Sequence, residues 1–243
     1  KTFEGEMADS VPNLACPAIY KKEQSPAGMN KAANGSKVRV NLDYFRCLAA
    51  MDENVGRIMG ELDKLGLADN TVLVFTGDNG YYHGEHGLGD KRAAYDEGLR
   101  IPLLFRYPAM GIKGRVIDQM VLNIDLAPTL LDLAGAEVPK TMQGRSWKSL
   151  LQGTAADWRK EYYYEYFAEQ GFAAPHVRAI RTETAKLIKY PNHDEWTEMF
   201  DLSADPYETK NLINDPAHAE LRQKLESEFR RLAAAAGCGE GGP

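Results

Sequence analysis

Residues 71–75, TVLVF, are an unbroken run of apolar and β-branched side chains that narrows the choice of folds. The run has the length of a strand, and its lack of alternation is typical of a strand buried on both faces. In residues 41–67, just before it, apolar side chains recur at helical spacing and Gly66 stands where a helix C-cap would. This spacing predicts a helix with one buried face. A helix, a short turn and a buried strand in succession indicate an α/β fold.

The same pattern continues to about residue 154. IPLLFR, residues 101–106, predicts a second strand, and VLNIDLAPTLLDLAG predicts a short strand and then a helix that starts near Asp125. Pro128 suits the first turn of that helix. SWKSLLQG predicts one more short helix. We therefore expect a partial mixed, mostly parallel sheet with flanking helices.

Beyond residue 155 the pattern changes, because short strand-like segments follow one another closely. EYYYEYF, HVRAIRT, AKLIKY and EWTEMFDL predict a small antiparallel sheet, and residues 216–236 predict a charged amphipathic helix before a frayed tail. This part is a smaller C-terminal α+β subdomain. The predicted organisation is an extended loop region, an α/β part and this subdomain, with the bounds 1–36, 37–154 and 155–243.

Composition excludes some classes of partner. The formal net charge is −6 and no basic run stands out, which argues against nucleic acid. No stretch approaches the length of an apolar membrane span. The chain opens KTFEGEMADS without the apolar region of a signal peptide, and its three cysteines show no paired spacing, so the compartment is left open.

The stretch TGDNGYYHGEHGLGDK, residues 76–91, contains the residues best suited to bind a metal ion or an anionic substrate. Asp78 and Asn79 come directly after the apolar strand, where open α/β sheets bind ligands, and their hard oxygens suit Ca²⁺ or Mg²⁺. The alternative is that Asp-Asn-Gly is only a turn. His83 and His86 lack the spacing of a zinc-binding helix, and the glycines around them oppose a helix. Lys91 has the chemistry to bind an oxyanion, although a solvated lysine is the commoner case.

A longer ordered series of motifs resembles the type I sulfatases of the alkaline-phosphatase-like superfamily. The apolar strand, Asp-Asn-Gly, Gly-Glu-His-Gly, Asp-Lys-Arg, Tyr-Asp-Glu and the next apolar strand run together in TGDNGYYHGEHGLGDKRAAYDEGLRIPLLFRYP. VLNIDLAPTLLDLAG with MQGRSWKSLLQG, and VRAIRTETAKLIKY with EMFDLSADPYETKNL, are similar to later parts of that family. The resemblance runs from about residue 41 to about residue 235.

This resemblance implies an alkaline-phosphatase-like fold and a sulfuric ester hydrolase. Asp78 and Asn79 would be two ligands of one divalent cation, usually calcium, and Lys91 would contact the sulfate oxygens. His83 and His176 would face the substrate; otherwise His83 makes loop hydrogen bonds and His176 packs at a strand start. The expected substrate is a sulfated small molecule or glycan, such as a 6-sulfated amino sugar.

The resemblance also implies a formylglycine nucleophile, made from the first residue of a Cys-x-Pro/Ala-x-Arg motif. Residues 16–20, CPAIY, match the third position but carry Tyr20 in place of the arginine, so Cys16 is expected to be a passive loop cysteine. The family's earlier metal ligands are not found either. We therefore expect a C-terminal portion of a sulfatase that is inactive alone, with a missing N-terminal part to complete the sheet and the site. Members of this family are often periplasmic, secreted or lysosomal.

Two other functions stay open at this point. One is a phosphate or phosphonate ester hydrolase of the same superfamily, although the neutral Asn79 favours a single-cation sulfatase site. The other is a non-catalytic protein that binds a sulfated glycan through Lys91 and the C-terminal subdomain.

Overall fold

A computed structural model describes residues 42–83, 85–172 and 174–237. The predicted loop region 1–36, and with it Cys16, lies outside the described residues. Among the described residues, none of the helices combines the length and the apolar character that a membrane crossing requires.

The described chain divides into two compact units. One, the strand-pair unit, holds residues 42–78 and 101–158; the other, the four-stranded unit, holds residues 79–100 and 159–237. The stretch that carries most of the predicted site residues therefore belongs to the same unit as the C-terminal part of the chain. The predicted domain boundaries themselves remain a prediction.

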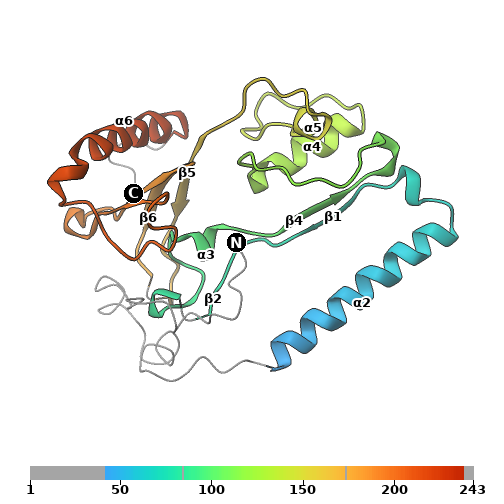
Figure 1. Cartoon of the computed structure of the whole chain (residues 1–243), viewed down its shortest axis with the longest axis horizontal. Coiled ribbons are helices and arrows are strands. Elements are labelled where there is room, and N and C mark those ends of the chain that lie inside the picture. Colours follow the sequence, from blue (N-terminus) through green and yellow to red (C-terminus); the bar gives the residue numbers. More distant parts are fainter. Residues whose placement is uncertain (1–41, 84, 173, 238–243) are drawn as a thin grey trace. The chain divides into compact units, whose positions relative to one another are not determined.

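The strand-pair unit contains a two-stranded sheet, a long helix and several short helices (Figure 1). Its elements are α2 (Leu42–Lys64), η2 (Ala68–Asn70), β1 (Leu73–Thr76), β4 (Leu103–Arg106), η4 (Pro108–Met110), η5 (Asn123–Asp125), α4 (Leu126–Leu133) and α5 (Lys148–Gln152). The helices predicted at residues 41–67 and near Asp125, and the strands around residues 73 and 103, are thus confirmed.

The long helix α2 ends as its sequence predicts. Gly66 has a φ of 66°, a left-handed conformation that glycine adopts without strain, and the Leu67 N–H donates to the Leu62 carbonyl at 2.9 Å. The expected buried face is not seen, because Phe45 is 54% and Ile58 is 56% exposed. Spacing predicts an amphipathic helix, but burial needs a partner, and none of the described residues covers this apolar stripe.

The expected parallel pairing is wrong for β1 and β4. These strands pair antiparallel, with Leu73 opposite Arg106 and Thr76 opposite Leu103, and no parallel pair occurs among the described strands. Parallel pairing needs a crossover, usually a helix that covers the sheet. The connection between these strands instead runs through the other unit, and the only α-helix among its described residues, α3 (Asp96–Leu99), has four residues. The side chains of β1 are also not buried on both faces.

The four-stranded unit is built on the antiparallel sheet that the sequence predicts. The strands lie in the order β5-β6-β7-β8, so each pairs with its neighbour in sequence. The larger elements are β5 (Glu161–Tyr166), β6 (Val177–Thr182), β7 (Ala185–Lys189), β8 (Glu198–Asp201) and α6 (Ala219–Ala235). The smaller ones are β2 (Tyr82–His83), η3 (Glu85–Gly87), β3 (Gly89–Asp90), α3, η6 (Asp194–Trp196) and η7 (Pro216–His218).

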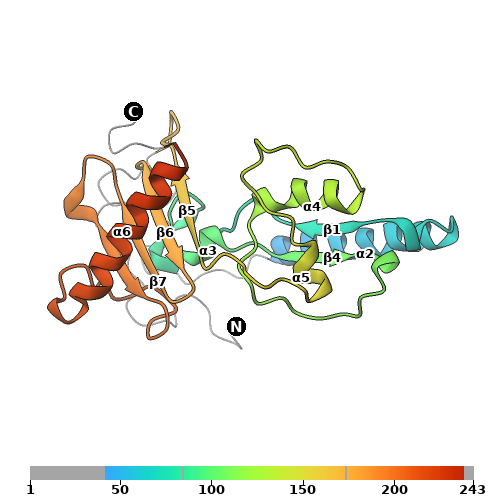
Figure 2. The same ribbon diagram turned by 90° about the horizontal axis from the view of Figure 1, so that it is seen from above.

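The two faces of this sheet have different partners. Helix α6 lies across one face and contacts β5, β6 and β7 (Figure 2), where Leu187 and Leu225 share a core. The 79–100 stretch packs on the other face, where Tyr82 and Ile188 belong to a second core. Because strand side chains alternate, Lys186 of β7 shares a face with Ile188 and is directed at the 79–100 stretch.

Candidate functional site

Asp78 and Asn79, the predicted metal ligands, follow β1 where the chain passes from one unit to the other. Asp78 is exposed, and the half-buried Asn79 donates from Nδ2 to the Gly80 carbonyl at 2.8 Å. The Gly80 N–H donates to the Gly98 carbonyl at 2.9 Å. A Cβ atom at Gly80 would lie 1.9 Å from the Glu97 carbonyl oxygen, so only glycine permits this approach. The backbone is thus fixed immediately after Asn79.

Two buried tyrosines hold the 79–100 stretch in place. The Tyr82 hydroxyl donates to the Ala93 carbonyl at 3.0 Å and accepts from the Tyr95 N–H at 3.1 Å. The ring of His86 stacks on that of Tyr95, with centroids 4.0 Å apart. His86 has a backbone φ of 55°, a left-handed conformation that residues other than glycine rarely adopt. The buried contacts hold it there, so His86 organises the loop and does not point into solvent.

The predicted sulfate contact and the two predicted substrate histidines all lie in the four-stranded unit. Lys91 follows β3 and is half-buried. His83 is exposed at the end of β2, with its ring centroid 4.9 Å from that of Tyr81. His176 is exposed just before β6 and accepts at Nδ1 from the Ala168 N–H at 3.4 Å. Their contacts with sulfate and substrate remain predictions.

Arg92, beside Lys91, belongs to the Asp-Lys-Arg motif but was not among the predicted site residues. Its guanidinium donates to both Glu169 carboxylate oxygens at 3.2 and 3.3 Å, binds the Asp90 carboxylate, and lies 3.5 Å from the Phe172 ring centroid. The Arg92 hydrogen bond lowers the pKa of Glu169, and the positive charge of Lys91 adds to this effect. Glu169 therefore lies near both cations. Arg92 and Glu169 are 77 positions apart, so no local pattern could have paired them.

A buried network of charged side chains joins the 79–100 stretch to the four-stranded sheet. The Nζ atom of Lys186, whose side chain is fully buried, lies 2.6 Å from Asp96 Oδ1 and 2.6 Å from Glu208 Oε1. Arg181 Nη2 lies 2.9 Å from Asp96 Oδ2. Burial alone would raise the pKa of Asp96, but the charges of Lys186 and Arg181 hold it well below its usual range. The network keeps the Asp96 carboxylate charged inside the protein.

One group of side chains, two of them buried and one half-buried, has the composition of a metal site. Ligand-type atoms of His86, Glu97 and Glu208 all lie within 4.8 Å of one another. However, the ammonium group of Lys186 already lies 2.6 Å from Glu208 Oε1. A cation would have to compete with that charge, so we assign no metal to this group.

Glu198 is a buried carboxyl group whose raised pKa should make the free energy of unfolding depend on pH. It accepts from the Tyr95 hydroxyl at 3.0 and 2.9 Å and from the Tyr190 hydroxyl at 2.8 Å. Burial raises its pKa to about 7, from an ordinary value of 4.5. The folded protein then holds a proton that the unfolded chain has lost, so the free energy of unfolding falls as pH rises between these values. The expected loss is roughly 3 kcal/mol at most.

Urea unfolding at about pH 5 and about pH 8 measures this loss. Glu198→Gln, which stays neutral, should flatten the pH dependence, whereas Glu220→Gln, at an exposed position on α6, should keep it. An unchanged slope in Glu198→Gln would show that another group is responsible.

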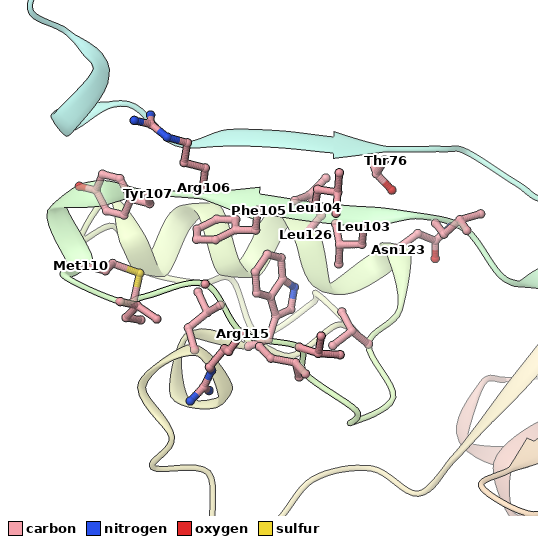
Figure 3. A pocket seen from close by; sticks show the side chains of 18 of the residues that line it. Thr76, Leu103, Leu104, Phe105, Arg106, Tyr107, Met110, Arg115, Asn123 and Leu126 are labelled. Atoms are coloured by element: carbon pink, nitrogen blue, oxygen red, sulfur yellow. The ribbon is translucent and has the colours of Figure 1, made fainter. Parts of the chain in front are cut away.

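The strand-pair unit contains a pocket of about 770 Å³ (Figure 3). Its walls are mostly apolar; Phe105 of β4 meets Trp147 edge to face, with ring centroids 5.0 Å apart. Arg106 and Arg115 belong to its lining, but the described lining residues include no carboxylate, no imidazole and none of the predicted site residues. The pocket therefore offers apolar surface rather than metal-binding chemistry.

Comparison with known proteins identifies the family. The sequence model described as Sulfatase matches residues 13–136, and the one described as N-sulphoglucosamine sulphohydrolase, C-terminal, matches residues 84–235. The chain belongs to the sulfatase family. The two matches overlap across residues 84–136, so this sulfatase chain holds part of the sulfatase domain and the C-terminal region that follows it.

Individual relatives agree with this assignment. An N-acetylglucosamine-6-O-sulfatase of Bacteroides thetaiotaomicron is 44% identical over 190 residues, which are 75% of this chain and 34% of the relative. A multifunctional alkaline phosphatase superfamily protein of Trinickia caryophylli is 31% identical over 73% of this chain and 37% of its own length. This sulfatase chain thus spans well under half of the length of these curated relatives.

Solved structures give the same answer for the fold. One solved protein, in complex with its substrate D-glucosamine-2-N,6-O-disulfate, has 39% sequence identity to this chain and a TM-score of 0.69. The match covers 77% of this chain and 39% of the solved one. A phosphonate monoester hydrolase from Silicibacter pomeroyi is 30% identical with a TM-score of 0.66, over 76% of this chain and 38% of its own. The sulfatase chain therefore has the fold of these relatives over most of its length.

Proposed function

We propose that this chain is part of a metal-assisted sulfatase that hydrolyses a sulfate ester on a carbohydrate, such as a 6-sulfated amino sugar. The observation that carries the proposal is the match to the sulfatase family across residues 13–136, which includes Asp78, Asn79 and Lys91. The carbohydrate is supported by the names of two relatives, an N-acetylglucosamine-6-O-sulfatase and a protein with a disulfated glucosamine substrate.

Calcium is the cation that we propose for Asp78 and Asn79. A carboxylate and an amide oxygen are hard ligands of the type that Ca²⁺ prefers, so the donor set fits. Since the Asn79 nitrogen donates to the Gly80 carbonyl, the cation would be bound by the amide oxygen. Two side chains supply at most three of the ~6–8 oxygens that calcium takes, so further ligands must come from elsewhere. The bound ion would draw negative charge from the sulfate oxygens.

Lys91 would contribute the positive charge that this chain itself directs at the sulfate group. Ester hydrolysis breaks the bond between sulfur and the ester oxygen, and negative charge builds up on the oxygens as it breaks. An ammonium group fixed beside them stabilises that charge. The buried contacts of Tyr82, Tyr95 and Lys186 hold the backbone that carries Lys91, which favours preorganisation.

The proposed enzyme also needs a nucleophile and the remaining calcium ligands. We propose that an N-terminal part supplies both, because relatives are two to three times as long as their matched portion. Cys16 lies outside the described residues, and its CPAIY context lacks the arginine of the formylglycine motif. The exposed apolar stripe of α2 offers a surface that such a part could cover.

A phosphonate or phosphate ester hydrolase is the second candidate. It is favoured by two relatives: the phosphonate monoester hydrolase structure at 30% identity and the multifunctional alkaline phosphatase superfamily protein at 31%. The neutral Asn79 favours the sulfatase, since an amide adds no negative charge to the metal site.

The test is sulfate release from 6-sulfated N-acetylglucosamine and from a chromogenic aryl sulfate. The 243-residue chain is compared with an N-terminally extended product of the same gene, co-expressed with the maturation machinery, with calcium or with a calcium chelator. We expect the extended product to release sulfate, the chelator to abolish release, and the chain alone to be inactive.

Other outcomes would favour other functions. Faster release from an aryl phosphate or a phosphonate monoester would favour the second candidate. Binding of the sugar sulfate without any release by the extended product would favour a glycan-binding protein. Activity of the chain alone would overturn the division of the site, and Cys16 would be the first nucleophile to replace.

A further inference from the structure

The segment between β5 and β6 presents two exposed aromatic rings, and one of them, Phe172, contacts Arg92, the residue next to Lys91. Phe172 is 51% and Phe167 is 55% exposed. Burial of apolar surface stabilises a protein by about 25 cal/mol for each Å² removed from water, and exposed rings do not gain this stabilisation. These two rings belong to the same unit as Lys91 and His176.

Phe172 is held in position although it is exposed. Its N–H donates to the Glu169 carbonyl at 3.2 Å, which closes a turn. One face of its ring lies against the Arg92 guanidinium, 3.5 Å from Cζ to the ring centroid. Arg92 is itself fixed by Glu169 and Asp90 and is 9% exposed. The ring therefore has a supported face and an exposed surface.

The surroundings of this ring suit a sugar better than a hydrocarbon. The charge of Arg92 is neutralised by the carboxylates of Asp90 and Glu169. Ligand sites typically combine an apolar wall with a few placed polar groups. A pyranose has one face of C–H groups, which packs on the electron-rich face of an aromatic ring, and hydroxyl groups at its edge.

We infer that Phe172 is a stacking platform for the sugar ring whose sulfate group binds Lys91. This inference rests on the proposed function and adds a specificity residue to it: Lys91 recognises the sulfate, and Phe172 recognises the pyranose that carries it. The Arg92 guanidinium, 3.5 Å from the ring centroid, supports the face of Phe172 opposite to the one offered to the sugar.

The test measures the Kd values of 6-sulfated N-acetylglucosamine and of inorganic sulfate by ligand-observed NMR titration of the full chain with calcium. Phe172→Ala should raise the Kd of the sugar sulfate roughly 3- to 10-fold, the range of one aromatic contact, and leave the Kd of inorganic sulfate unchanged. Phe172→Trp should keep the sugar affinity. Phe45→Ala, at a position that is 54% exposed in the other unit, is the matched control and should change neither value.

The outcomes separate the inference from the function on which it rests. Equal weakening of both ligands by Phe172→Ala would show that the ring only positions Arg92 and Lys91, and would overturn the platform. Unchanged sugar affinity, with weaker association of the N-terminal part, would make Phe172 a protein contact instead. If neither the wild-type chain nor the N-terminally extended product binds the sugar sulfate, the proposed function is wrong, and the inference with it.

Discussion

Replacing Lys186 by methionine is expected to destabilise the four-stranded unit by roughly 3–5 kcal/mol, the usual cost of removing one partner from a buried ion pair. Lys186 is fully buried between Asp96 and Glu208, at 2.6 Å from each. Without it, Arg181 still pairs with Asp96, whereas Glu208 loses the cation that its carboxylate contacts. Urea unfolding followed by circular dichroism measures the loss.

The double variant Lys186→Met with Glu208→Gln separates charge from packing. Because the uncompensated carboxylate is gone, we expect it to be more stable than the single variant. Lys224→Met, at an exposed position on α6, should stay close to wild type. If Lys186→Met is as stable as this control, the ion pairs of Lys186 do not hold the 79–100 stretch on the sheet.

Replacing Lys91 by alanine is expected to lower the kcat/KM for sulfate release by roughly 10²–10³-fold in the N-terminally extended product, the usual cost of losing one group that stabilises developing charge. Lys91 is half-buried and lies on a stretch whose backbone is fixed by buried tyrosines. A charge held in this way needs no reorganisation as the ester bond breaks. The rates are measured with the 6-sulfated sugar and with an aryl sulfate.

Three comparisons make this result specific. Lys140→Ala, at an exposed position in the other unit, should keep full activity. Lys91→Arg should recover only part of the loss, because a planar guanidinium does not reproduce a compact ammonium charge. Circular dichroism of Lys91→Ala should match wild type. Wild-type rates in a folded Lys91→Ala protein would remove Lys91 from the site.

The segments that were predicted most accurately are those with strong local signals. Apolar spacing predicted α2 and α6, and Gly66 predicted the end of α2, because helix formation and capping depend on residues within a few positions of one another. The closely spaced strands of residues 161–201 form the predicted antiparallel sheet for the same reason. The order of motifs from Asp78 to Lys91 indicated the sulfatase family, because a series of motifs in one order is more specific than any single motif.

The sequence alone therefore determined the order of most elements, the C-terminal sheet and the family. Only the tertiary structure decided that β1 and β4 pair antiparallel and that the apolar stripe of α2 is exposed. It also decided that Arg92 meets Glu169 across 77 positions and that Glu208 meets Asp96 across 112. Periodicity reports on neighbours along one helix or strand, whereas these pairings depend on where the chain turns back, which leaves no local signal.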